Sequence, residues 1–534
     1  MHCTCIRHTD LPHTTRLFAD LGYHFDRVRS IYHYAPFDPE SFVAAAREVQ
    51  MDAAHRARLV EALAEQNRNS GPVAQNNLDR LSQPETLAVV TGQQVGLYTG
   101  PVYTIYKALT AARMAADLTR RGLPAVPVFW LATEDHDLGE VNHAWVFDSA
   151  NHPIRLEAAA RAEPNQPVGG VRLDGNACEA LRGALAALPF GAEIADLAQK
   201  YYPQGATFGA GFQALLARLL EPHGVLMLDP LSPAIRRLAA PLMARAIQAA
   251  PEFSAALLAR GKELESGGYH VQVHFEERTS LFFLLQNGRR TPLRRSSDSY
   301  TGNGASLTTA QLLARLETSP EDFSPNALLR PVVQDFLLPT VVYIGGPAEL
   351  AYLAQAEVLY RRLLGRMPVA HPRACFTVLD ARSEKLMRRY GLSVADTLHG
   401  LAALEQKIAD TLIPGPLQRT FLEANDQIES ALAATEAQLA AFDPTLAAAL
   451  TKSRQKIKYQ FSKIRDKTGR ESLRRVERAR SDAAYLLHLI YPEKTLQERL
   501  YSVLPFLARH GMGLLEQLHD SIHLDCPDHQ VVVV

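Results

Sequence analysis

Cysteine is scarce and scattered in this chain. Only five of the 534 residues are cysteine, and no two of them are spaced as C-x-x-C. A disulfide framework or a dithiol redox motif needs paired cysteines at short spacing, so the sequence argues against both. The five positions are Cys3, Cys5, Cys178, Cys375 and Cys526.

Long apolar runs and an excess of charge of either sign are also missing. No stretch approaches the roughly 18 consecutive apolar residues that a membrane helix requires, and the first residues contain no long apolar region. The formal net charge is -1, which removes the global electrostatic argument for nucleic acid binding. We therefore expect a cytoplasmic protein that binds neither nucleic acid nor a membrane.

The chain contains enough apolar residues to form more than one hydrophobic core. With 47% apolar and 21% charged residues, the chain should form two or three domains. An apolar run at 87–90, a helical period over 103–121 and an apolar run at 126–131 predict a strand, a helix and a second, parallel strand. This order indicates a Rossmann-like α/β core. The loops that follow its strands should share one edge of the sheet, where such folds bind ligands.

A glycine-rich segment, T-G-Q-Q-V-G-L-Y-T-G-P, occupies residues 91–101, directly after the first predicted strand. Its glycines, Gly92, Gly96 and Gly100, should allow positive φ angles and a close approach of the backbone to a ligand. The spacing matches neither the Walker A motif nor the dinucleotide fingerprint. A plain strand-to-helix connection is therefore the alternative interpretation.

The helix after this segment should begin with its amide groups directed toward the ligand edge. Thr99 is a candidate N-cap, and Pro101 suits the first turn. Lys107 would add a positive charge one to two turns into the helix. Such a helix start attracts a carboxylate or a phosphate group.

Four polar residues, Glu134-Asp135-His136-Asp137, follow the second predicted strand. Alternate residues of an extended segment face the same way, so either Glu134 and His136 or Asp135 and Asp137 should face the ligand. We favour an acid–base and substrate-orienting role. One alternative is that Asp137 only caps a short helix. A metal site that also uses His143 is another alternative, but strong zinc spacing is absent, and we predict no metal.

These motifs together resemble one family, the bacillithiol-biosynthesis cysteine-adding enzymes, or cysteine ligases. The resemblance rests on motifs found in the same order over residues 85–505. They are T-G-Q-Q-x-G-L-x-T-G-P-x-Y-T-x-x-K (91–107), V-F-W-x-x-x-E-D-H-D-x-x-E-x-N-H (128–143), R-P-V-V-Q-D-x-x-L-P (330–339), Y-I-G-G-P-x-E-x-x-Y (343–352) and Q-E-R-L-Y (497–501).

The resemblance implies an enzyme that forms a carbon–nitrogen bond. Its reaction would join the carboxyl group of cysteine to the amine of glucosaminyl-malate, the last step of bacillithiol synthesis. It also implies a Rossmann-like core similar to class I aminoacyl-tRNA synthetases and nucleotidylyltransferases. The sequence departs from those enzymes because it has neither a His-x-Gly-His motif nor a Lys-Met-Ser-Lys-Ser loop. Use of ATP, or binding of ADP, is therefore expected from the resemblance alone, because neither synthetase motif is present in this sequence.

The candidate site residues fall into three groups. The catalytic candidates are Glu134, Asp135, His136 and Asp137. The candidates for substrate binding are Thr91, Gly92, Gln93, Gln94, Gly96, Thr99, Gly100, Tyr103, Thr104, Lys107, Arg330, Tyr343, Gly345, Gly346 and Glu349. The candidates for binding an adenine nucleotide are Lys385, Arg499 and Tyr501, whose alternative is surface charge beside a packed tyrosine.

Long helices replace the α/β pattern from about residue 382. The spacing of apolar positions predicts two helices that pair as an antiparallel coiled coil across a turn at 442–445. The seam of the first is Phe421, Asn425, Ile428, Leu432, Thr435, Leu439 and Phe442. Because apolar seam residues on such an arm could be covered by a partner, we expect a homodimer.

The predicted organisation interrupts the core twice. Val271–His274 and Leu281–Leu285 are expected to form a hairpin in the second insertion. The predicted boundaries are 1–83 for an N-terminal segment, 84–150 for the first half of the core, 151–203 for a first insertion, 204–240 for more of the core, 241–325 for a second insertion, 326–381 for the second half of the core, 382–490 for the arm and 491–534 for a C-terminal segment that packs on the core.

Two functions from different classes fit these features. The first is the cysteine ligase. The second is a nucleotide- or metabolite-binding scaffold or sensor, in which the coiled coil transmits the bound state, since a fold alone does not determine function. The crowding of four polar groups after one strand favours the enzyme, because a sensor does not need a general base.

Overall fold

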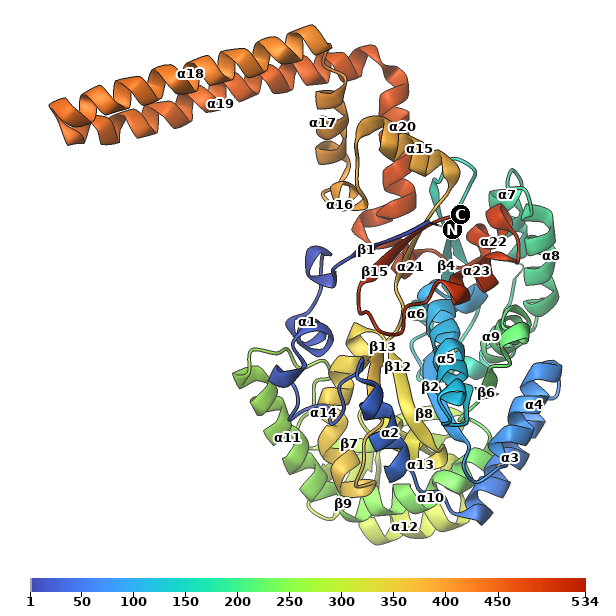
Figure 1. The fold of residues 1–534 in the computed structure, drawn as a ribbon. Helices are drawn as coiled ribbons and strands as arrows, with labels where there is room; N and C mark the ends of the chain where they lie inside the picture. The colour runs from blue at the N-terminus through green and yellow to red at the C-terminus, as the bar shows by residue number, and fades with distance from the viewer. Residues whose placement is uncertain (1, 176) are drawn as a thin grey trace.

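A parallel β-sheet lies at the centre of the computed structural model, which describes residues 2–175 and 177–534 (Figure 1). The strands are ordered β13-β12-β2-β3-β6. In chain order this is the arrangement 3-2-1-4-5, which is that of a Rossmann-like sheet. The bounds are β2 (Leu87–Gln94), β3 (Ala125–Ala132), β6 (Leu226–Leu228), β12 (Thr340–Gly345) and β13 (Val369–Pro372).

Each central strand is apolar on both faces because helices cover both sides of the sheet. In β3, Val128 and Trp130 pack with the cluster that contains α3 and α4, whereas Phe129 and Leu131 pack with the cluster on the opposite face. The helix α5 (Tyr103–Arg120) connects β2 to β3, as predicted, and α14 (Pro347–Leu363) connects β12 to β13. The strand order reverses between β2 and β12, and such switch points are where these folds bind ligands.

The N-terminal segment supplies helices to the outside of the sheet. α3 and α4 contact β6 and β3, and α2 contacts β12 and β13. The helices of this segment are α1 (Arg16–Tyr23), α2 (Pro39–Glu48), α3 (Ala53–Gln66) and α4 (Pro72–Leu81).

The first insertion follows β3 and lies against the C-terminal segment. Its strand β4 is antiparallel to β5, and its helix α8 contacts α22. The elements are α6 (Leu138–Val141), β4 (His143–Phe147), β5 (Pro153–Glu157), α7 (Cys178–Leu185) and α8 (Gly191–Tyr201), after which α9 (Phe208–Leu219) leads into β6.

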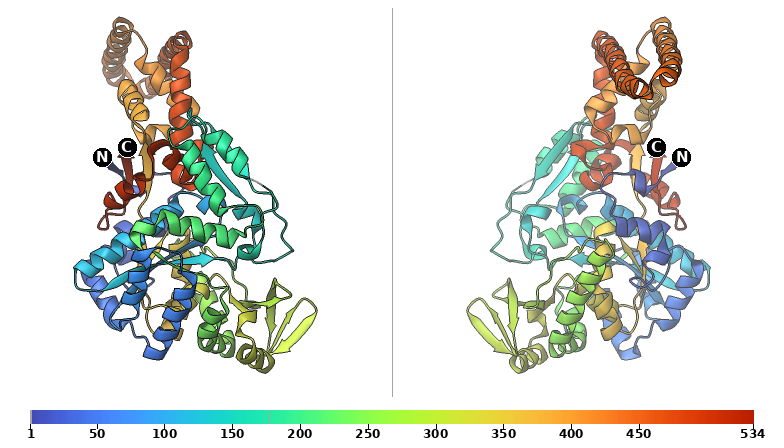
Figure 2. Two further views of the ribbon diagram at one scale, coloured as in Figure 1. Left: turned by 90° about the vertical axis from the view of Figure 1, so that its right-hand side faces the viewer. Right: turned by 90° about the vertical axis from the view of Figure 1, so that its left-hand side faces the viewer.

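The second insertion is a small antiparallel sheet carried on helices, and it projects from the core (Figure 2). Its hairpin differs from the prediction, because Val271–His274 is not a strand and β7 pairs with β8 instead. The elements are α10 (Pro233–Gln248), α11 (Ala250–Ser266), β7 (Thr279–Gln286), β8 (Arg289–Ser296), β9 (Ser299–Gly302), β10 (Ala305–Thr308), α12 (Thr309–Thr318), β11 (Phe323–Pro325) and α13 (Arg330–Leu337).

The helical arm extends far from the core as two antiparallel helices, α18 (Gly415–Phe442) and α19 (Pro444–Arg475) (Figure 1). The predicted pairing is confirmed: the rings of Phe421 and Phe461 lie 5.7 Å apart across the seam. Glu429 bridges the helices by ion pairs with Arg454 and with Lys458. The base of the arm contains α15 (Ala381–Tyr390), α16 (Val394–Thr397), α17 (Leu401–Thr411) and α20 (Glu477–Ile490).

The chain ends meet in a second, small sheet ordered β1-β15-β14, with β1 antiparallel and β14 parallel to β15. The two end labels accordingly lie side by side in Figure 1. The strands are β1 (His2–Ile6), β14 (Phe376–Leu379) and β15 (His529–Val533), and the helices of the C-terminal segment are α21 (Gln497–Leu500), α22 (Leu504–His510) and α23 (Leu514–Asp520). Within the described residues, no helix combines the length and apolarity needed to cross a membrane.

Candidate functional site

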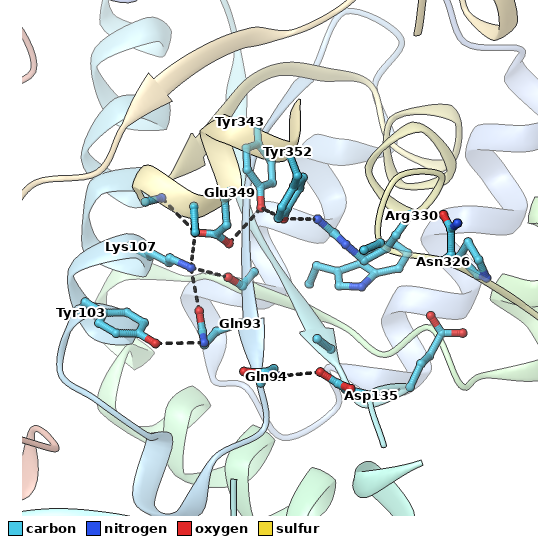
Figure 3. A pocket seen from close by; sticks show the side chains of 18 of the residues that line it. Gln93, Gln94, Tyr103, Lys107, Asp135, Asn326, Arg330, Tyr343, Glu349 and Tyr352 are labelled. Carbon is cyan, nitrogen blue, oxygen red and sulfur yellow. Dashed lines mark hydrogen bonds and ion pairs between the residues drawn. The ribbon is translucent and has the colours of Figure 1, made fainter. Parts of the chain in front are cut away.

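A cavity of about 480 Å³ opens at the carboxyl ends of the central strands, where β2 and β12 are neighbours (Figure 3). The core, the second insertion and the C-terminal segment all contribute to its wall. The lining residues are Gly92, Gln93, Gln94, Tyr103, Lys107, Trp130, Ala132, Glu134, Asp135, His136, Phe283, Arg290, Pro325, Asn326, Ala327, Arg330, Tyr343, Gly346, Pro347, Ala348, Glu349, Tyr352, Arg373 and Arg499.

The structure brings many of the predicted residues together here, but not all of them. Three of the four catalytic candidates line the cavity, as do nine of the substrate candidates and one nucleotide candidate. The predicted residues outside its lining are Thr91, Gly96, Thr99, Gly100, Thr104, Asp137, Gly345, Lys385 and Tyr501.

Lys107 is the centre of a hydrogen-bonded cluster on one wall. Its Nζ lies 2.5 Å from Glu349 Oε2 and donates to Gln93 Oε1 at 2.7 Å and to the Gly92 carbonyl at 3.0 Å. Burial lowers the pKa of Lys107 to about 8, although Glu349 opposes that shift. The expectation that Lys107 offers a free charge to an anionic ligand is therefore corrected: its charge is neutralised within the protein.

The glycine-rich segment serves packing more than ligand contact. Of its three glycines, Gly100 alone has a positive φ (66°), whereas Gly96 is extended and Gly92 lies within β2; the non-glycine residues Tyr98 and Thr99 also have positive φ angles. Thr99 does not cap α5, because the hydroxyl of Thr99 is buried without a hydrogen-bond partner among the described residues. Val102 N, just before α5, donates instead to the Tyr501 carbonyl at 2.7 Å.

The first turn of α14 contributes three consecutive backbone positions at its start to the cavity wall. Gly346, Pro347 and Ala348 line the wall, and Gly346 N donates to Glu349 Oε2 at 2.8 Å. Glu349 thus closes the first turn of its own helix while it holds Lys107. The two glycine turns predicted to share one edge of the sheet are joined by this ion pair.

A chain of hydroxyl groups continues from Glu349 to Arg330 (Figure 3). The Tyr343 hydroxyl donates to Glu349 Oε1 at 3.2 Å and lies 3.4 Å from the Tyr352 hydroxyl, to which Arg330 Nη2 donates at 2.7 Å. Burial and the Glu349 charge raise the pKa of Tyr343 well above its ordinary value, so its hydroxyl keeps its proton. Arg330 also lies 5.9 Å from the Trp130 ring centroid.

Glu134 is buried in an ion pair, whereas Asp135 and His136 lie at the accessible edge of the cavity. Glu134 is buried against Arg236, whose Nη2 donates to Glu134 Oε1 at 2.6 Å. Asp135 and His136 remain partly exposed, with 31% and 38% of their side chains accessible. Gln94 Nε2 donates to Asp135 Oδ2 at 2.5 Å, which fixes the carboxylate at the edge of the cavity.

Asp137 is not part of the cavity lining. It is the N-cap of α6, and its Oδ1 accepts a hydrogen bond from Glu140 N at 3.3 Å. The alternating orientation expected for an extended segment is wrong, because the chain turns at Thr133–Glu134 as soon as β3 ends. The structure thus supports the capping role that was the alternative for this residue.

The three nucleotide candidates do not form one site in this structure. Tyr501 is fully buried, its hydroxyl donates to the His488 carbonyl at 2.6 Å, and its ring packs against Phe147. Arg499 lines the cavity, whereas Lys385 is exposed on α15 and is not part of the cavity wall. Burial of Tyr501 corrects the idea that its ring is available for stacking with a base.

Several lining residues were missed by sequence reasoning, and the second insertion and the loop after it supply some of them. Phe283 and Arg290 come from the hairpin of β7 and β8, and Asn326 follows β11. The turn of that hairpin is Asn287-Gly288, with φ angles of 52° and 73°. An Asn-Gly pair between two apolar or alternating runs is a strong hairpin signal, so this element could have been found.

One buried group has the residue types of a metal site: Cys375, Glu498 and His529, with ligand atoms within 4.8 Å of one another. The carboxylate of Glu498 is already occupied, since Arg373 donates to both of its oxygens. Burial also raises the pKa of Cys375 to about 12, which disfavours the thiolate that a metal would need. We therefore assign these residues to the packing of the C-terminal segment.

The chain matches two domains described for one family over almost its whole length. The N-terminal Rossmann-like domain of bacillithiol biosynthesis BshC matches residues 1–374, and the C-terminal coiled-coil domain of BshC matches residues 376–534. The curated relatives include "Putative cysteine ligase BshC" of Solibacter usitatus (strain Ellin6076), 52% identical over 534 residues and the whole of both chains. The protein of the same name from Koribacter versatilis (strain Ellin345) is 38% identical over 99% of both chains, and that of Salinibacter ruber (strain DSM 13855 / M31) is 33% identical over 97% of this chain and 96% of its own. The order of domains, the cavity at the switch point of the sheet and these full-length matches lead to one conclusion: this chain belongs to the BshC family of bacillithiol biosynthesis proteins.

Proposed function

We propose that this chain is a cysteine ligase that joins the carboxyl group of cysteine to the amine of glucosaminyl-malate, which produces the amide of bacillithiol. The observation that carries the proposal is the meeting of Asp135 and His136 with several arginines in one cavity, in a chain whose full-length relatives bear the ligase name. The scaffold or sensor alternative lacks comparable support, because a binding protein does not need a partly exposed carboxylate and imidazole beside the ligand.

The cavity suits the acceptor amine of this reaction. When an amine attacks an acyl carbon, the new carbon–nitrogen bond forms, the leaving group departs from the acyl carbon, and the nitrogen loses a proton to a base. Asp135 is held by Gln94 Nε2 and by the amide of His136, which donates to Asp135 Oδ1 at 2.7 Å. We assign proton removal to Asp135 or His136, and positioning of their turn to the ion pair of Glu134 with Arg236.

The carboxyl group of cysteine needs activation, because a free carboxylate is a poor electrophile. An adenylate or another activated acyl group would meet this need. Use of ATP or ADP stays a prediction, and Arg499 is the nucleotide candidate whose place in the cavity wall fits it. A cytoplasmic location likewise stays a prediction.

We also propose that the arm forms a homodimer with a second copy of the chain. The inner seam is filled by contacts such as that between Phe421 and Phe461. Apolar side chains of the arm nevertheless remain exposed, including the predicted seam residue Phe442, and a partner could cover them. They are Leu417, Leu422, Phe442, Leu446, Ile457, Tyr459 and Ile464.

The test of the ligase proposal is conjugate formation. Purified protein is incubated with cysteine, glucosaminyl-malate and ATP, and the product is identified by mass spectrometry. We expect the conjugate only when both substrates and active protein are present. Failure to form it, both with ATP and with chemically prepared cysteinyl-adenylate, would contradict the proposed function.

A further inference from the structure

Arg290 brings a positive charge into the cavity from the second insertion. Its Nε donates to Ser324 Oγ at 3.1 Å, its Nη2 donates to the Pro325 carbonyl at 2.6 Å, and its Cζ lies 4.0 Å from the centroid of the Phe283 ring. Among the residues that the structure describes, no carboxylate forms an ion pair with Arg290, and its Nη1 has no hydrogen-bond partner.

The other cations of the wall are Lys107, Arg330, Arg373 and Arg499, of which Arg499 is exposed and forms no ion pair among the described residues. Lys107 is neutralised by Glu349, and Arg373 is neutralised by Glu498. Arg330 uses both of its terminal nitrogens on neutral partners, since Nη1 donates to Gln334 and Nη2 to Tyr352. Arg290 thus lines the cavity without a direct ion-pair partner among the described residues, although the carboxylates of Glu134 and Asp135 lie near enough to favour its charge, and its Nη1 is free of hydrogen bonds.

Arg290 is held in place from two sides. Its backbone N donates to the Asn165 carbonyl at 2.7 Å, and the neighbouring Arg289 forms an ion pair with Glu163 at 2.6 Å. Both contacts join the hairpin of the second insertion to the loop of the first insertion. A guanidinium that is stacked and hydrogen-bonded before a ligand arrives loses little freedom on binding, which favours affinity and selectivity.

The surroundings of Arg290 favour a planar carboxylate over a phosphate. Stacking on Phe283 fixes the plane of the guanidinium, and one edge remains for a planar acceptor pair. Asp135 lines the same cavity, so a phosphate, which gathers up to two negative charges on one group, would be repelled there more strongly than a single carboxylate. The Phe283 ring also lies 6.2 Å from the His136 ring, so a small ligand can reach Arg290 and His136 at once.

We propose that Arg290 is a specificity-determining residue that binds a carboxylate of the malyl group and thereby presents the acceptor amine to Asp135 and His136. This proposal rests on the proposed function and extends it, because it assigns acceptor recognition to the inserted hairpin. It also replaces the expectation from the sequence that Lys107 supplies the positive charge for an anionic ligand, because Glu349 neutralises Lys107.

The test compares Arg290→Gln and Arg290→Lys with Arg294→Gln. Arg294 lies on the same strand, but its side chain is 70% accessible and pairs with Glu276 outside the cavity wall. A charge-assisted hydrogen bond of ~1.5–3 kcal/mol corresponds to roughly 10- to 100-fold, so KM for glucosaminyl-malate should rise by about that factor in Arg290→Gln. kcat should change much less, Arg290→Lys should recover part of the loss, and Arg294→Gln should match the wild type.

Acceptors in which one malyl carboxylate is converted to a carboxamide provide the sharper comparison. For one of the two monoamides, wild type and Arg290→Gln should have the same KM, because the group that Arg290 binds is gone. Equal losses for the diacid and both monoamides would overturn the proposal, since they would indicate a structural defect.

Calorimetry with L-malate separates this proposal from the ligase activity. We expect wild type and Arg294→Gln to bind malate and Arg290→Gln to bind it roughly 10- to 100-fold more weakly. If the wild type forms no conjugate yet this difference in malate binding is found, the carboxylate site stands and the proposed function fails. If the conjugate forms and malate binding is equal in all three proteins, Arg290 is not the recognition residue.

Discussion

Arg373 and Glu498 form a buried two-point ion pair that ties the C-terminal segment to the cavity wall. Arg373 Nη2 and Nη1 donate to Glu498 Oε1 and Oε2 at 2.6 and 3.0 Å, and each side chain is only 3% accessible. Burial alone would raise the pKa of Glu498, but the charge and hydrogen bonds of Arg373 lower it to about 2. The Tyr103 ring lies 5.2 Å from the Arg373 guanidinium and 5.5 Å from Lys107 Nζ, so it contacts both cations of this wall.

Removal of one partner should therefore leave an uncompensated buried charge. We expect Glu498→Ala to lower the free energy of unfolding by about 3–5 kcal/mol, because Arg373 would lose its counter-ion in the core. Chemical denaturation measures this change. The control is Glu384→Ala, which breaks an exposed pair with Arg388 and should cost below ~1 kcal/mol. Similar losses in both variants would contradict the assignment.

The different placement of Asp135 and Asp137 predicts different effects of the same substitution. Asp135→Asn should lower the turnover number by about 10²- to 10⁴-fold if Asp135 is the general base, and His136→Ala should do so if His136 is. Asp137→Asn should have little effect, since Asn caps a helix about as well as Asp and Asp137 is outside the cavity. Conjugate formation at saturating substrate is the measurement. Near-normal turnover in both Asp135→Asn and His136→Ala would assign this turn a structural role.

Gly92 is required by the close approach of two strands. A Cβ at this position would lie 2.7 Å from the Trp130 carbonyl oxygen, its register partner in β3. Gly92→Ala should therefore destabilise the fold by about 1–3 kcal/mol through overpacking. Gly183→Ala is the matched control, because a Cβ there meets nothing within 4 Å and Gly183 lies in α7, where alanine should stabilise by roughly 0.5–1 kcal/mol. Thermal unfolding of the two variants should shift in opposite directions.

The buried His8 should make the protein less stable in mild acid. Burial, and then the neighbouring His529, lower the pKa of His8 to about 4, against about 6.5 in an unfolded chain. Between these values the unfolded chain binds a proton that the folded chain does not, so stability is lost as the pH falls from about 6.5 toward 4.

Replacement of His8 removes this contribution. In His8→Phe, which can keep the packing against Phe18, the loss of stability between about pH 7 and pH 5 should be smaller than in the wild type. Urea unfolding at both pH values gives the difference. An identical pH dependence in the two proteins would show that His8 already titrates normally in the fold.

The exposed apolar residues of the arm predict its role in assembly. Leu422 and Ile464 are 58% and 56% accessible, and the double variant Leu422→Glu/Ile464→Glu should convert a dimer to a monomer of half the mass. Light scattering measures this directly. Val73→Glu, at an exposed apolar residue away from the arm, should leave the mass unchanged. A wild type that is already monomeric would remove the arm from the assembly argument.

Local pattern was sufficient for the central part of the fold. The apolar runs around Val89 and Val128 are buried on both faces, so their continuous hydrophobicity marks them as strands independently of distant partners. The heptad spacing of α18 and α19 was also informative. One short turn joins the two helices, so their apolar seams, which include Phe421 and Phe461, pair along the arm. The hairpin of β7 and β8 was misplaced, because the alternating segment after Asn287-Gly288 is rich in arginine and was not recognised as a strand.

The site was less predictable because its charges are decided by distant partners. Lys107 has the charge that an anion site needs, but its neutralisation depends on Glu349, which another strand and helix bring to it. Glu134 and Asp135 are adjacent in sequence, yet Arg236 buries the first and Gln94 holds the second at the cavity. Sequence spacing identified the residue types that gather here, while only the packing shows which of them are available to a ligand.

The position of β15 between β1 and β14 sets the order in which the chain can finish folding. The strand partners of Cys3, Thr4 and Cys5 are Val532, Val531 and Gln530. During synthesis, residues 2–6 therefore cannot pair as a strand until residues 529–533 have left the ribosome. The small sheet is thus among the last parts of the fold to form. The Rossmann-like core can fold while the arm is still being made, but the pair of Glu498 with Arg373 cannot form until the C-terminal segment follows.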